Sequence, residues 1–224
     1  MSRRPKTLRN PSKPILYLIT RGATNEATRA GDPEFAQILK QISAAVAARV
    51  DLIQIRERQL TARVLFELVT EAGKLTRGAS TRLLVNDRAD IAATAGADGV
   101  HLTTQSLDAA TIKRTFGEKF LVGASTHSLA EAESASEQGA DFAVFGPVFE
   151  TESKLQFGSP KGLDELAQLV RALPDFPVLA LGGISRLNAA ECLSAGASGI
   201  AGISLFDNPE NYGDLVAALR NSGA

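Results

Sequence analysis

The 224-residue sequence contains a single cysteine, Cys192. One thiol cannot form an internal disulfide and provides no zinc-finger spacing, so a disulfide-stapled scaffold is excluded. No apolar run approaches the roughly 18 residues that a membrane span needs. The stretch 1–13 is basic and lacks the apolar centre of a secretory signal. We therefore expect a cytoplasmic protein with no membrane partner, in which residues 1–13 form a flexible tail.

The chain also lacks a charge excess and two common nucleotide-binding signatures. The 24 basic and 25 acidic residues give a net charge of −1, which does not suggest a nucleic-acid partner. No GxGxxG follows the first apolar run, and no Walker A motif occurs. Dinucleotide-binding and P-loop folds therefore lose support. With 44% hydrophobic and 22% charged residues, the composition fits one globular domain with a large core.

Eight short apolar runs recur along the chain, with helical segments between them, and this alternation predicts a parallel sheet. The predicted strands are Ile15–Ile19, Leu52–Ile55, Leu83–Val85, Gly99–Leu102, Phe120–Gly123, Phe142–Phe145, Val178–Leu181 and Gly199–Ile203. The main predicted helices are Pro33–Arg49, Thr61–Leu75, Arg88–Ala95, Ser106–Phe116, Ser128–Gln138, Leu163–Leu173 and Pro209–Arg220. Eight units without a long linker predict a single (β/α)8 barrel over residues 14–224.

In such a barrel the catalytic residues lie at the carboxyl ends of the strands. The ends of the last two strands offer a candidate phosphate-binding site. Gly182 and Gly183 follow the seventh run, so their backbone N–H groups are open to an anion. Ser204 follows the eighth run and adds a hydroxyl. The alternative is that the two glycines serve only the geometry of a tight turn.

The second strand end is rich in hydrogen-bond donors. Gln54, Arg56 and Arg58 are two residues apart, so they can share one face of an extended strand. Two guanidinium groups on one face suit a phosphate or a carboxylate. The alternative is a surface salt-bridge cluster with Glu57.

The third and fourth strand ends carry two further candidates for a role at the site. Asn86 and Asp87 follow the third run, and Asp87 is either a cation ligand or a helix cap. His101 lies within the fourth apolar run, which favours a histidine of the barrel lumen over a catalytic one.

The fifth and sixth strand ends provide an acid–base candidate and a polar loop. Ser125, Thr126 and His127 follow the fifth run, and the His127 imidazole could exchange protons near neutral pH. Its alternative role is to steady the helix that follows. The loop after the sixth run contains hydroxyls and a cation that suit an anion or a polar ring substituent, unless the loop is only solvated. These loop residues are Thr151, Ser153 and Lys154.

Over residues 16–206 the sequence resembles the thiamine-phosphate synthase and TenI family. The motifs that carry this resemblance are IQIRER (53–58), VNDRADIA (85–92), GADGVHL (96–102), GASTHSLAEA (123–132), FGPVFETESK (145–154), PVLALGGI (177–184) and GASGIAGIS (196–204). The resemblance implies a barrel that is often dimeric and acts on a thiazole phosphate. One branch of the family joins hydroxymethylpyrimidine diphosphate to thiazole phosphate, with Mg²⁺ and release of pyrophosphate. The TenI branch aromatises a carboxythiazole phosphate by moving a proton, without metal.

The resemblance also implies roles for individual residues. The family's diphosphate-binding stretch is matched by Gln54, Arg56 and Arg58. The pyrimidine and magnesium site is matched by Asn86 and Asp87, and the TenI acid–base histidine is matched by His127. Thr151, Ser153 and Lys154 match the TxTK loop, whereas Gly183 and Ser204 match the thiazole-phosphate cradle. Arg58 stands where synthases usually have lysine, and Ser106 stands where they have a second magnesium aspartate.

The absence of one magnesium carboxylate decides which of the two activities we expect. A diphosphate leaving group is best stabilised by Mg²⁺ held by one or two carboxylates, whereas proton relocation needs only a base and a bound phosphate. We therefore expect a TenI-like thiazole tautomerase that needs no cofactor. The alternatives are a Mg²⁺-dependent thiamine-phosphate synthase, with Asp87 as the metal ligand, and a non-catalytic barrel that binds a phosphate ligand.

Overall fold

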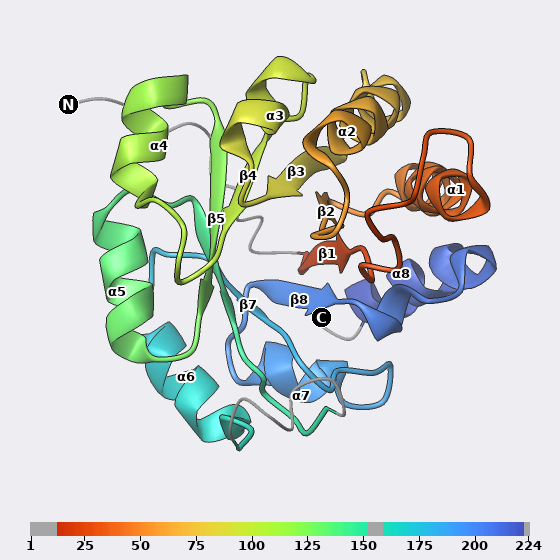
Figure 1. Ribbon diagram of the computed structural model, residues 1–224. Coiled ribbons are helices and arrows are strands. Elements are labelled where there is room, and N and C mark those ends of the chain that lie inside the picture. The colour runs from red at the N-terminus through yellow and green to blue at the C-terminus, as the bar shows by residue number, and fades with distance from the viewer. Residues whose placement is uncertain (1–12, 152–158, 222–224) are drawn as a thin grey trace.

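The computed structural model describes residues 13–151 and 159–221 and shows eight parallel strands closed into a barrel (Figure 1). Each strand pairs with the next in sequence, and β1 pairs with β8. The predicted (β/α)8 barrel is confirmed. The strands are β1 Ile15–Ile19, β2 Leu52–Ile55, β3 Arg82–Asn86, β4 Gly99–Leu102, β5 Leu121–Thr126, β6 Phe142–Phe145, β7 Val178–Ala180 and β8 Gly199–Gly202.

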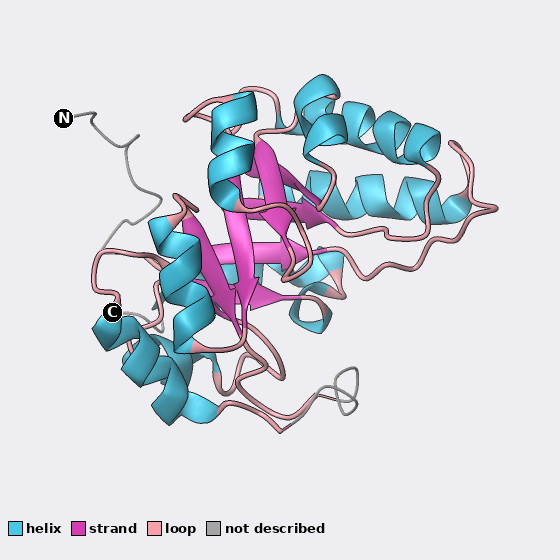
Figure 2. Cartoon of the chain, turned by 60° about the vertical axis from the view of Figure 1, so that its left-hand side comes forward, coloured by secondary structure: helices cyan, strands magenta, loops and turns pink. Residues whose placement is uncertain are grey.

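The helices lie outside the strands, as the view of Figure 2 shows. They are α1 Pro33–Ala47, α2 Ala62–Thr76, α3 Ala89–Thr94, α4 Ala109–Phe116, α5 Leu129–Glu137, α6 Gly162–Ala172, α7 Ala189–Ser194 and α8 Tyr212–Asn221. Two short 3₁₀ turns, Ser204–Phe206 and Pro209–Asn211, precede α8. The helix predicted from Pro209 therefore begins as a 3₁₀ turn, and its α-helical part starts three residues later.

Two local expectations were wrong. Ser106 does not cap α4, because Asp108 takes that position and accepts a hydrogen bond from the Thr111 amide at 2.7 Å. Strand β5 runs on to Thr126 instead of ending at Gly123, because its pairing with β6 continues to Thr126 opposite Phe145. Ser125 therefore lies within a strand and not in the loop after it.

Alternation along the strands separates a lumen from an outer core. The side chains of Ile15, Tyr17 and Ile19 join a cluster inside the barrel, whereas Leu16 and Leu18 join the larger cluster under the helices. Successive strand residues point to opposite faces, so the strands contribute to both clusters, except for β4, which contributes only to the outer one. This is why the strands read as continuous apolar runs rather than alternating ones.

Acidic residues stand at the amino ends of β2, β4 and β6. Each of three aspartates accepts a hydrogen bond from a main-chain amide of the preceding strand, at 2.7–2.9 Å. The pairs are Asp51 with Leu16, Asp98 with Leu83, and Asp141 with Val122. The side chain of Lys113 is 7% exposed and pairs with Asp141 at 2.7 Å. These contacts hold the end of the barrel opposite the strand carboxyl ends.

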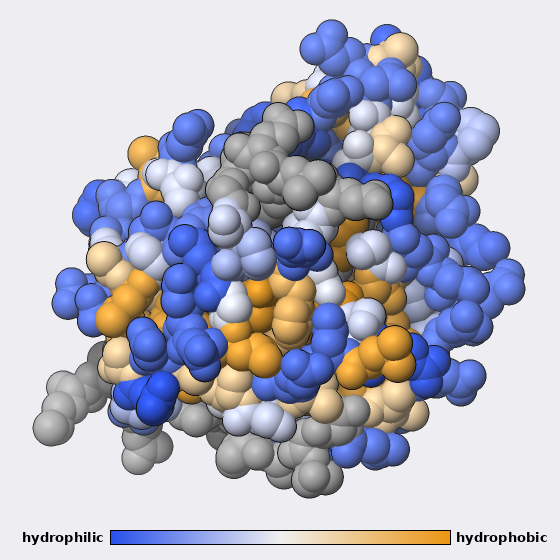
Figure 3. Space-filling view, turned by 90° about the horizontal axis from the view of Figure 1, so that it is seen from below, coloured by the Kyte–Doolittle hydropathy of each residue, from blue (hydrophilic) through white to orange (hydrophobic). Residues whose placement is uncertain are grey.

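Within the described ranges, no helix is long and apolar enough to cross a membrane. Figure 3 shows one face on which hydrophobic side chains gather near the centre with hydrophilic ones around them. The most exposed large hydrophobic side chain in the described part is Leu187, at 92%, in the loop between β7 and α7.

Candidate functional site

The carboxyl ends of the strands form the mouth of the barrel, and polar side chains follow several of them. Gln54 at the end of β2 donates to the Asn86 side chain at the end of β3, at 3.0 Å. Both residues were predicted site residues, and the closed barrel places their side chains in contact. Because Gln54 is buried and Asn86 is half-buried, the pair leads from the lumen to the mouth.

Glu57 does not form the predicted alternative of a surface salt-bridge cluster. Its carboxylate is buried and accepts four hydrogen bonds from the loop after β1. The donors are the Thr20 hydroxyl at 2.6 Å, the Gly22 amide at 3.1 Å, and the Thr24 amide and hydroxyl at 3.2 and 2.7 Å. Glu57 therefore fixes the β1–α1 loop to the end of β2. The Thr20 hydroxyl also accepts a hydrogen bond from the Arg56 amide at 2.8 Å. The contact between Glu57 and Thr20 therefore also positions the backbone of Arg56.

Arg56 and Arg58 form no ion pair with an acidic side chain in the described parts of the chain. Arg56 is half-buried and Arg58 is exposed. Burial lowers the pKa of Arg56, the charge of Arg58 lowers it further, and Glu57 counteracts both. Two guanidinium groups at one strand end, with no acidic ion-pair partner in the described parts of the chain, are suited to bind an anion.

Asp87 does not cap the helix that follows it. The α3 helix has no side-chain cap, and the Asp87 carboxylate instead accepts a hydrogen bond from the Ser106 hydroxyl at 2.5 Å. Asp87 has a left-handed backbone, with φ 59°, and its amide donates to the His101 carbonyl at 2.9 Å. Ser106 also accepts from the Thr103 amide at 2.8 Å. The carboxylate is thus held beside Ser106, the position at which the resemblance implies a second magnesium aspartate.

The side-chain oxygen atoms of Asp87 and Ser106 provide only part of a magnesium site. The described residues contain no group of three or more acidic, histidine or cysteine side chains that could hold a metal. Mg²⁺ is commonly bound by one or two carboxylates, with substrate phosphates and water as the other ligands. One carboxylate and one hydroxyl therefore fit a Mg²⁺ that arrives with a phosphorylated substrate, but not a metal held by the protein alone.

His101 is a histidine of the lumen, as predicted. Its Nδ1 lies 3.2 Å from the Tyr17 hydroxyl, and its Nε2 lies 3.0 Å from the Ser125 hydroxyl. Burial lowers the pKa of His101 to about 3, with a further contribution from the charge of Arg56. The imidazole is therefore neutral at physiological pH. Sequence reasoning missed Tyr17, although its place in the middle of an apolar strand was a signal that its hydroxyl needs a buried partner.

His127 follows β5 directly and contacts the first turn of α5. Its backbone amide donates to Glu131 Oε2 at 2.6 Å, and its Nδ1 lies 3.3 Å from the same oxygen. The side chain is 41% exposed. These contacts match the alternative role of steadying the helix, and they do not involve Nε2.

The seventh and eighth strand ends lie beside one another, because β7 pairs with β8. Gly182 and Gly183 have φ values of 101° and 65°, and a Cβ at Gly183 would lie 2.3 Å from the Glu150 carbonyl oxygen. Turn geometry and close packing therefore both require glycine here. Among the described residues, neither glycine amide has a hydrogen-bond acceptor. Ser204 is exposed at the next strand end. The arrangement is thus compatible with an anion seat as well as with a turn.

The loop after β6 is described as far as Thr151, which is half-buried, and again from Ser159. The predicted site residues Ser153 and Lys154 lie outside the described residues.

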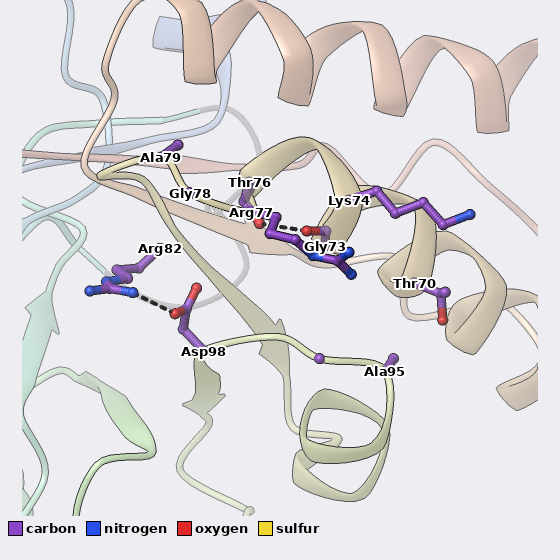
Figure 4. A pocket seen from close by; sticks show the side chains of 11 residues that line it. Thr70, Gly73, Lys74, Thr76, Arg77, Gly78, Ala79, Arg82, Ala95 and Asp98 are labelled. Atoms are coloured by element: carbon purple, nitrogen blue, oxygen red, sulfur yellow. Dashed lines mark hydrogen bonds and ion pairs between the residues drawn. The ribbon is translucent and has the colours of Figure 1, made fainter.

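A cavity of about 200 Å³ lies at the opposite end of the barrel, between the end of α2 and the start of β3. Lys74 pairs with Glu71, and Arg82 pairs with Asp98. Figure 4 shows Lys74 and Arg82 pointing away from each other. Lys74 and Arg82 therefore do not converge on one ligand there, and the mouth remains the candidate site.

Comparison with known proteins gives relatives over most of the chain. The sequence profile of the family described as thiamine monophosphate synthase matches residues 16–206. A protein of Geobacter sulfurreducens named putative thiamine-phosphate synthase is 44% identical over 208 residues, covering 91% of this chain and 93% of the relative. The thiamine-phosphate synthase of Chloroflexus aurantiacus is 40% identical over 179 residues, covering 80% of this chain and 81% of the relative.

A solved structure agrees with these sequence relatives. Thiamine phosphate pyrophosphorylase from Pyrococcus furiosus superposes with a TM-score of 0.75 and 30% identity, covering 95% of this chain and 99% of that one. The family match spans all eight strands except the first residue of β1. The chain therefore belongs to the thiamine monophosphate synthase family.

Proposed function

We propose that the protein is a thiamine-phosphate synthase, which joins hydroxymethylpyrimidine diphosphate to thiazole phosphate. In this reaction the bond between the pyrimidine methylene carbon and the diphosphate oxygen breaks, and a bond from that carbon to the thiazole nitrogen forms. The diphosphate leaves with the bonding electron pair. This proposal follows the names of the relatives and replaces tautomerisation, the activity that the sequence favoured, as the leading hypothesis.

The observation that carries the proposal is the presence of two separate groups of anion-binding donors at one mouth. Arg56 and Arg58 lie at the end of β2, next to Asp87 at the end of β3. The glycine amides and Ser204 lie at the ends of β7 and β8. The strand order β7–β8–β1–β2 separates the two groups. Two separate seats suit a reaction between a diphosphate and a monophosphate.

In the reaction, the chain's residues hold and orient both substrates. The guanidinium groups neutralise the negative charge that grows on the departing diphosphate. This lowers the activation barrier to breaking the carbon–oxygen bond. The amides of Gly182 and Gly183, with Ser204, hold the thiazole phosphate so that the ring nitrogen reaches the methylene carbon. Asp87 and Ser106 would hold the Mg²⁺, which supplies electrostatic stabilisation of the diphosphate when bound.

A direct assay tests the proposal. Purified protein is given both substrates with Mg²⁺, and pyrophosphate release is measured, with each substrate omitted in turn as control. We expect release only when both substrates are present. The variant Arg56→Ala should raise the KM for the pyrimidine diphosphate about tenfold or more, because it removes a charged hydrogen bond worth about 1.5–3 kcal/mol. Lack of pyrophosphate release at saturating substrates would refute the proposal.

Tautomerisation remains the second candidate, because Ser106 replaces a metal carboxylate and His127 follows β5. It is tested with the carboxythiazole phosphate tautomer in the absence of metal. Turnover that is lost in His127→Asn would establish this activity. If neither reaction occurs and thiazole phosphate still binds, the protein is a non-catalytic binding barrel.

A further inference from the structure

The short turn that carries Ser204 is a compact unit of its own. Ser204 begins the 3₁₀ turn Ser204–Phe206 shortly after β8, and it is exposed. Two hydrogen bonds close the turn, from the Phe206 amide to the Ile203 carbonyl at 3.1 Å and from the Asp207 amide to the Ser204 carbonyl at 3.2 Å. These bonds make Ser204 and Phe206 move together, but they do not fix the turn relative to the strand end of β7.

The carbonyl group of Phe206 supplies the missing anchor. Its oxygen accepts two hydrogen bonds, from the Tyr212 hydroxyl at 2.5 Å and from Gln41 Nε2 at 3.0 Å. Gln41 Nε2 also donates to the Tyr212 hydroxyl at 3.1 Å. Gln41 lies on α1 and Tyr212 begins α8, and these two helices lie side by side (Figure 1). The three groups therefore form a triangle of hydrogen bonds that ties the turn to both helices.

The triangle uses the hydrogen-bonding capacity of its members fully. The Phe206 carbonyl accepts with both lone pairs, the Gln41 amide donates both of its hydrogens, and the Tyr212 hydroxyl donates one hydrogen bond and accepts one. Tyr212 is 1% exposed, and burial raises its pKa to about 12, so the hydroxyl keeps the proton that it donates. A different arrangement would leave a buried donor unpaired, which is costly.

Packing restricts the same turn. The Phe206 side chain is fully buried and meets the Tyr212 ring edge to face, with 5.6 Å between the ring centroids. The turn also lies close to the end of β8, where a Cβ at Gly202 would lie 2.7 Å from the Cβ of Leu205. A rotation of the turn would displace a buried ring and break both hydrogen bonds of the Phe206 carbonyl. The position of Ser204 is therefore set by residues of α1 and α8.

We propose that Gln41 and Tyr212 are positioning residues for the monophosphate substrate, because they hold the Ser204 hydroxyl in place beside the glycine amides at the end of β7. This inference rests on the proposed function, in which Gly182, Gly183 and Ser204 bind the thiazole phosphate. It goes beyond that function because it assigns a role to two helical residues that act through the Phe206 carbonyl. It also requires that they affect one of the two substrates and not the other.

A comparison of the two KM values tests the proposal. Tyr212→Phe keeps the ring and removes the hydroxyl, and Gln41→Met keeps the length of the side chain and removes both donors. Each variant should raise the KM for thiazole phosphate about fivefold, as expected for the loss of a neutral hydrogen bond. The KM for the pyrimidine diphosphate should not change, because its proposed ligands Arg56 and Arg58 follow a different strand. An equal rise in both KM values, or no rise for thiazole phosphate, would overturn the proposal.

Two further variants separate positioning from a general loss of stability. Asp141→Asn breaks the ion pair with Lys113 at the opposite end of the barrel, so it should lower stability and leave both KM values unchanged. The double variant Gln41→Met with Tyr212→Phe should raise the KM for thiazole phosphate by less than the product of the two single effects, because both residues act through one carbonyl. Fully multiplicative effects would contradict this shared action.

A binding measurement with inorganic phosphate reads the same site without turnover. The ¹H–¹⁵N signals of Gly182, Gly183 and Ser204 are followed during a phosphate titration. We expect these signals to shift, with a dissociation constant about fivefold higher in Tyr212→Phe. Such a result in a protein without synthase activity would support the inference although the proposed function had failed. Equal dissociation constants, or no shift of these three signals, would overturn the inference even in an active synthase.

Discussion

The hydroxyl of Ser106 donates a hydrogen bond to the carboxylate of Asp87, with 2.5 Å between the two oxygens. The two residues are 19 positions apart and follow neighbouring strands, β3 and β4. A hydroxyl thus occupies the place from which a second carboxylate would reach the same ion. The pair leaves the proposed magnesium site with one negative charge from the protein.

Ser106→Asp should therefore strengthen metal binding. We expect the Mg²⁺ concentration for half-maximal pyrophosphate release to fall by roughly tenfold, because the added carboxylate contributes about 1.4 kcal/mol to cation binding. In metal-free buffer the same variant should melt at a lower temperature, because two carboxylates would face each other without a cation. Ser106→Ala is the control without added charge. An unchanged Mg²⁺ dependence in Ser106→Asp would place the metal elsewhere.

Glu57→Gln should weaken both stability and substrate binding. A glutamine keeps one acceptor oxygen, so its NH₂ group would face donors of Thr20 or Thr24 that the carboxylate now satisfies. We expect a loss of about 2 kcal/mol in the free energy of unfolding, measured by urea denaturation. The KM for the pyrimidine diphosphate should also rise, because the Thr20 hydroxyl accepts from the Arg56 amide.

Glu67→Gln is the matched control for Glu57→Gln. Glu67 lies on α2 in an exposed ion pair with Arg63, and its loss should cost less than about 0.5 kcal/mol. Equal effects of the two substitutions would mean that the four buried hydrogen bonds of Glu57 add no more stability than a surface charge does.

The two acidic residues at the amino ends of β4 and β6 should differ in their contribution to stability. Asp141→Asn leaves the ammonium group of Lys113, which is 7% exposed, without its carboxylate, and should cost about 3 kcal/mol in the free energy of unfolding. Asp98→Asn removes a pair with Arg82, whose side chain is 54% exposed, and should cost about 1 kcal/mol or less. Chemical denaturation of both variants measures the difference, and a reversed order would contradict this assignment.

The buried imidazole of His101 should make stability depend on pH. Burial lowers its folded-state pKa from 6.5 to about 3, so the unfolded chain takes up a proton in a range where the folded protein does not. His101 therefore contributes stability above pH 6.5 that is lost progressively as the pH falls towards 3. The slope is at most about 1.4 kcal/mol per pH unit for one proton.

Urea unfolding at several pH values between 7.5 and 4.5 measures this dependence. The variant His101→Gln cannot take up the proton, so its unfolding free energy should fall less steeply over the same range. Parallel curves for the variant and the unmodified protein would show that His101 is not the group responsible.

Local patterns predicted the barrel and most strand bounds. The bounds of β1, β2, β4 and β6 are as predicted, because each is a short apolar run enclosed by turn or polar residues. The end of β5 was wrong because Ser125 and Thr126 are polar, although β6 continues to pair with them. Polarity marks the end of a strand only where the neighbouring strand also ends.

The candidate site was predicted less completely than the fold. Gln54, Asn86, Arg56 and Asp87 were chosen as candidates because they lie at or just after the ends of strands, a position that the sequence alone reveals. Glu57 was assigned to a possible surface cluster, and Tyr17 was not identified at all. Their hydrogen-bond partners, Thr24 and His101, are 33 and 84 residues away in the sequence, and no local pattern connects them.

The sequence by itself determined the alternation of strands and helices, the barrel that follows from it, and the residues that stand at the strand ends. These depend on burial and periodicity within short segments. Only the tertiary structure decided which of those side chains meet: Ser106 with Asp87, Glu57 with the β1–α1 loop, and Tyr17 with His101 and Ser125. Closing the sheet brings residues that are far apart in the sequence within hydrogen-bond distance, across the lumen for Tyr17, His101 and Ser125 and at the strand ends for the other two contacts.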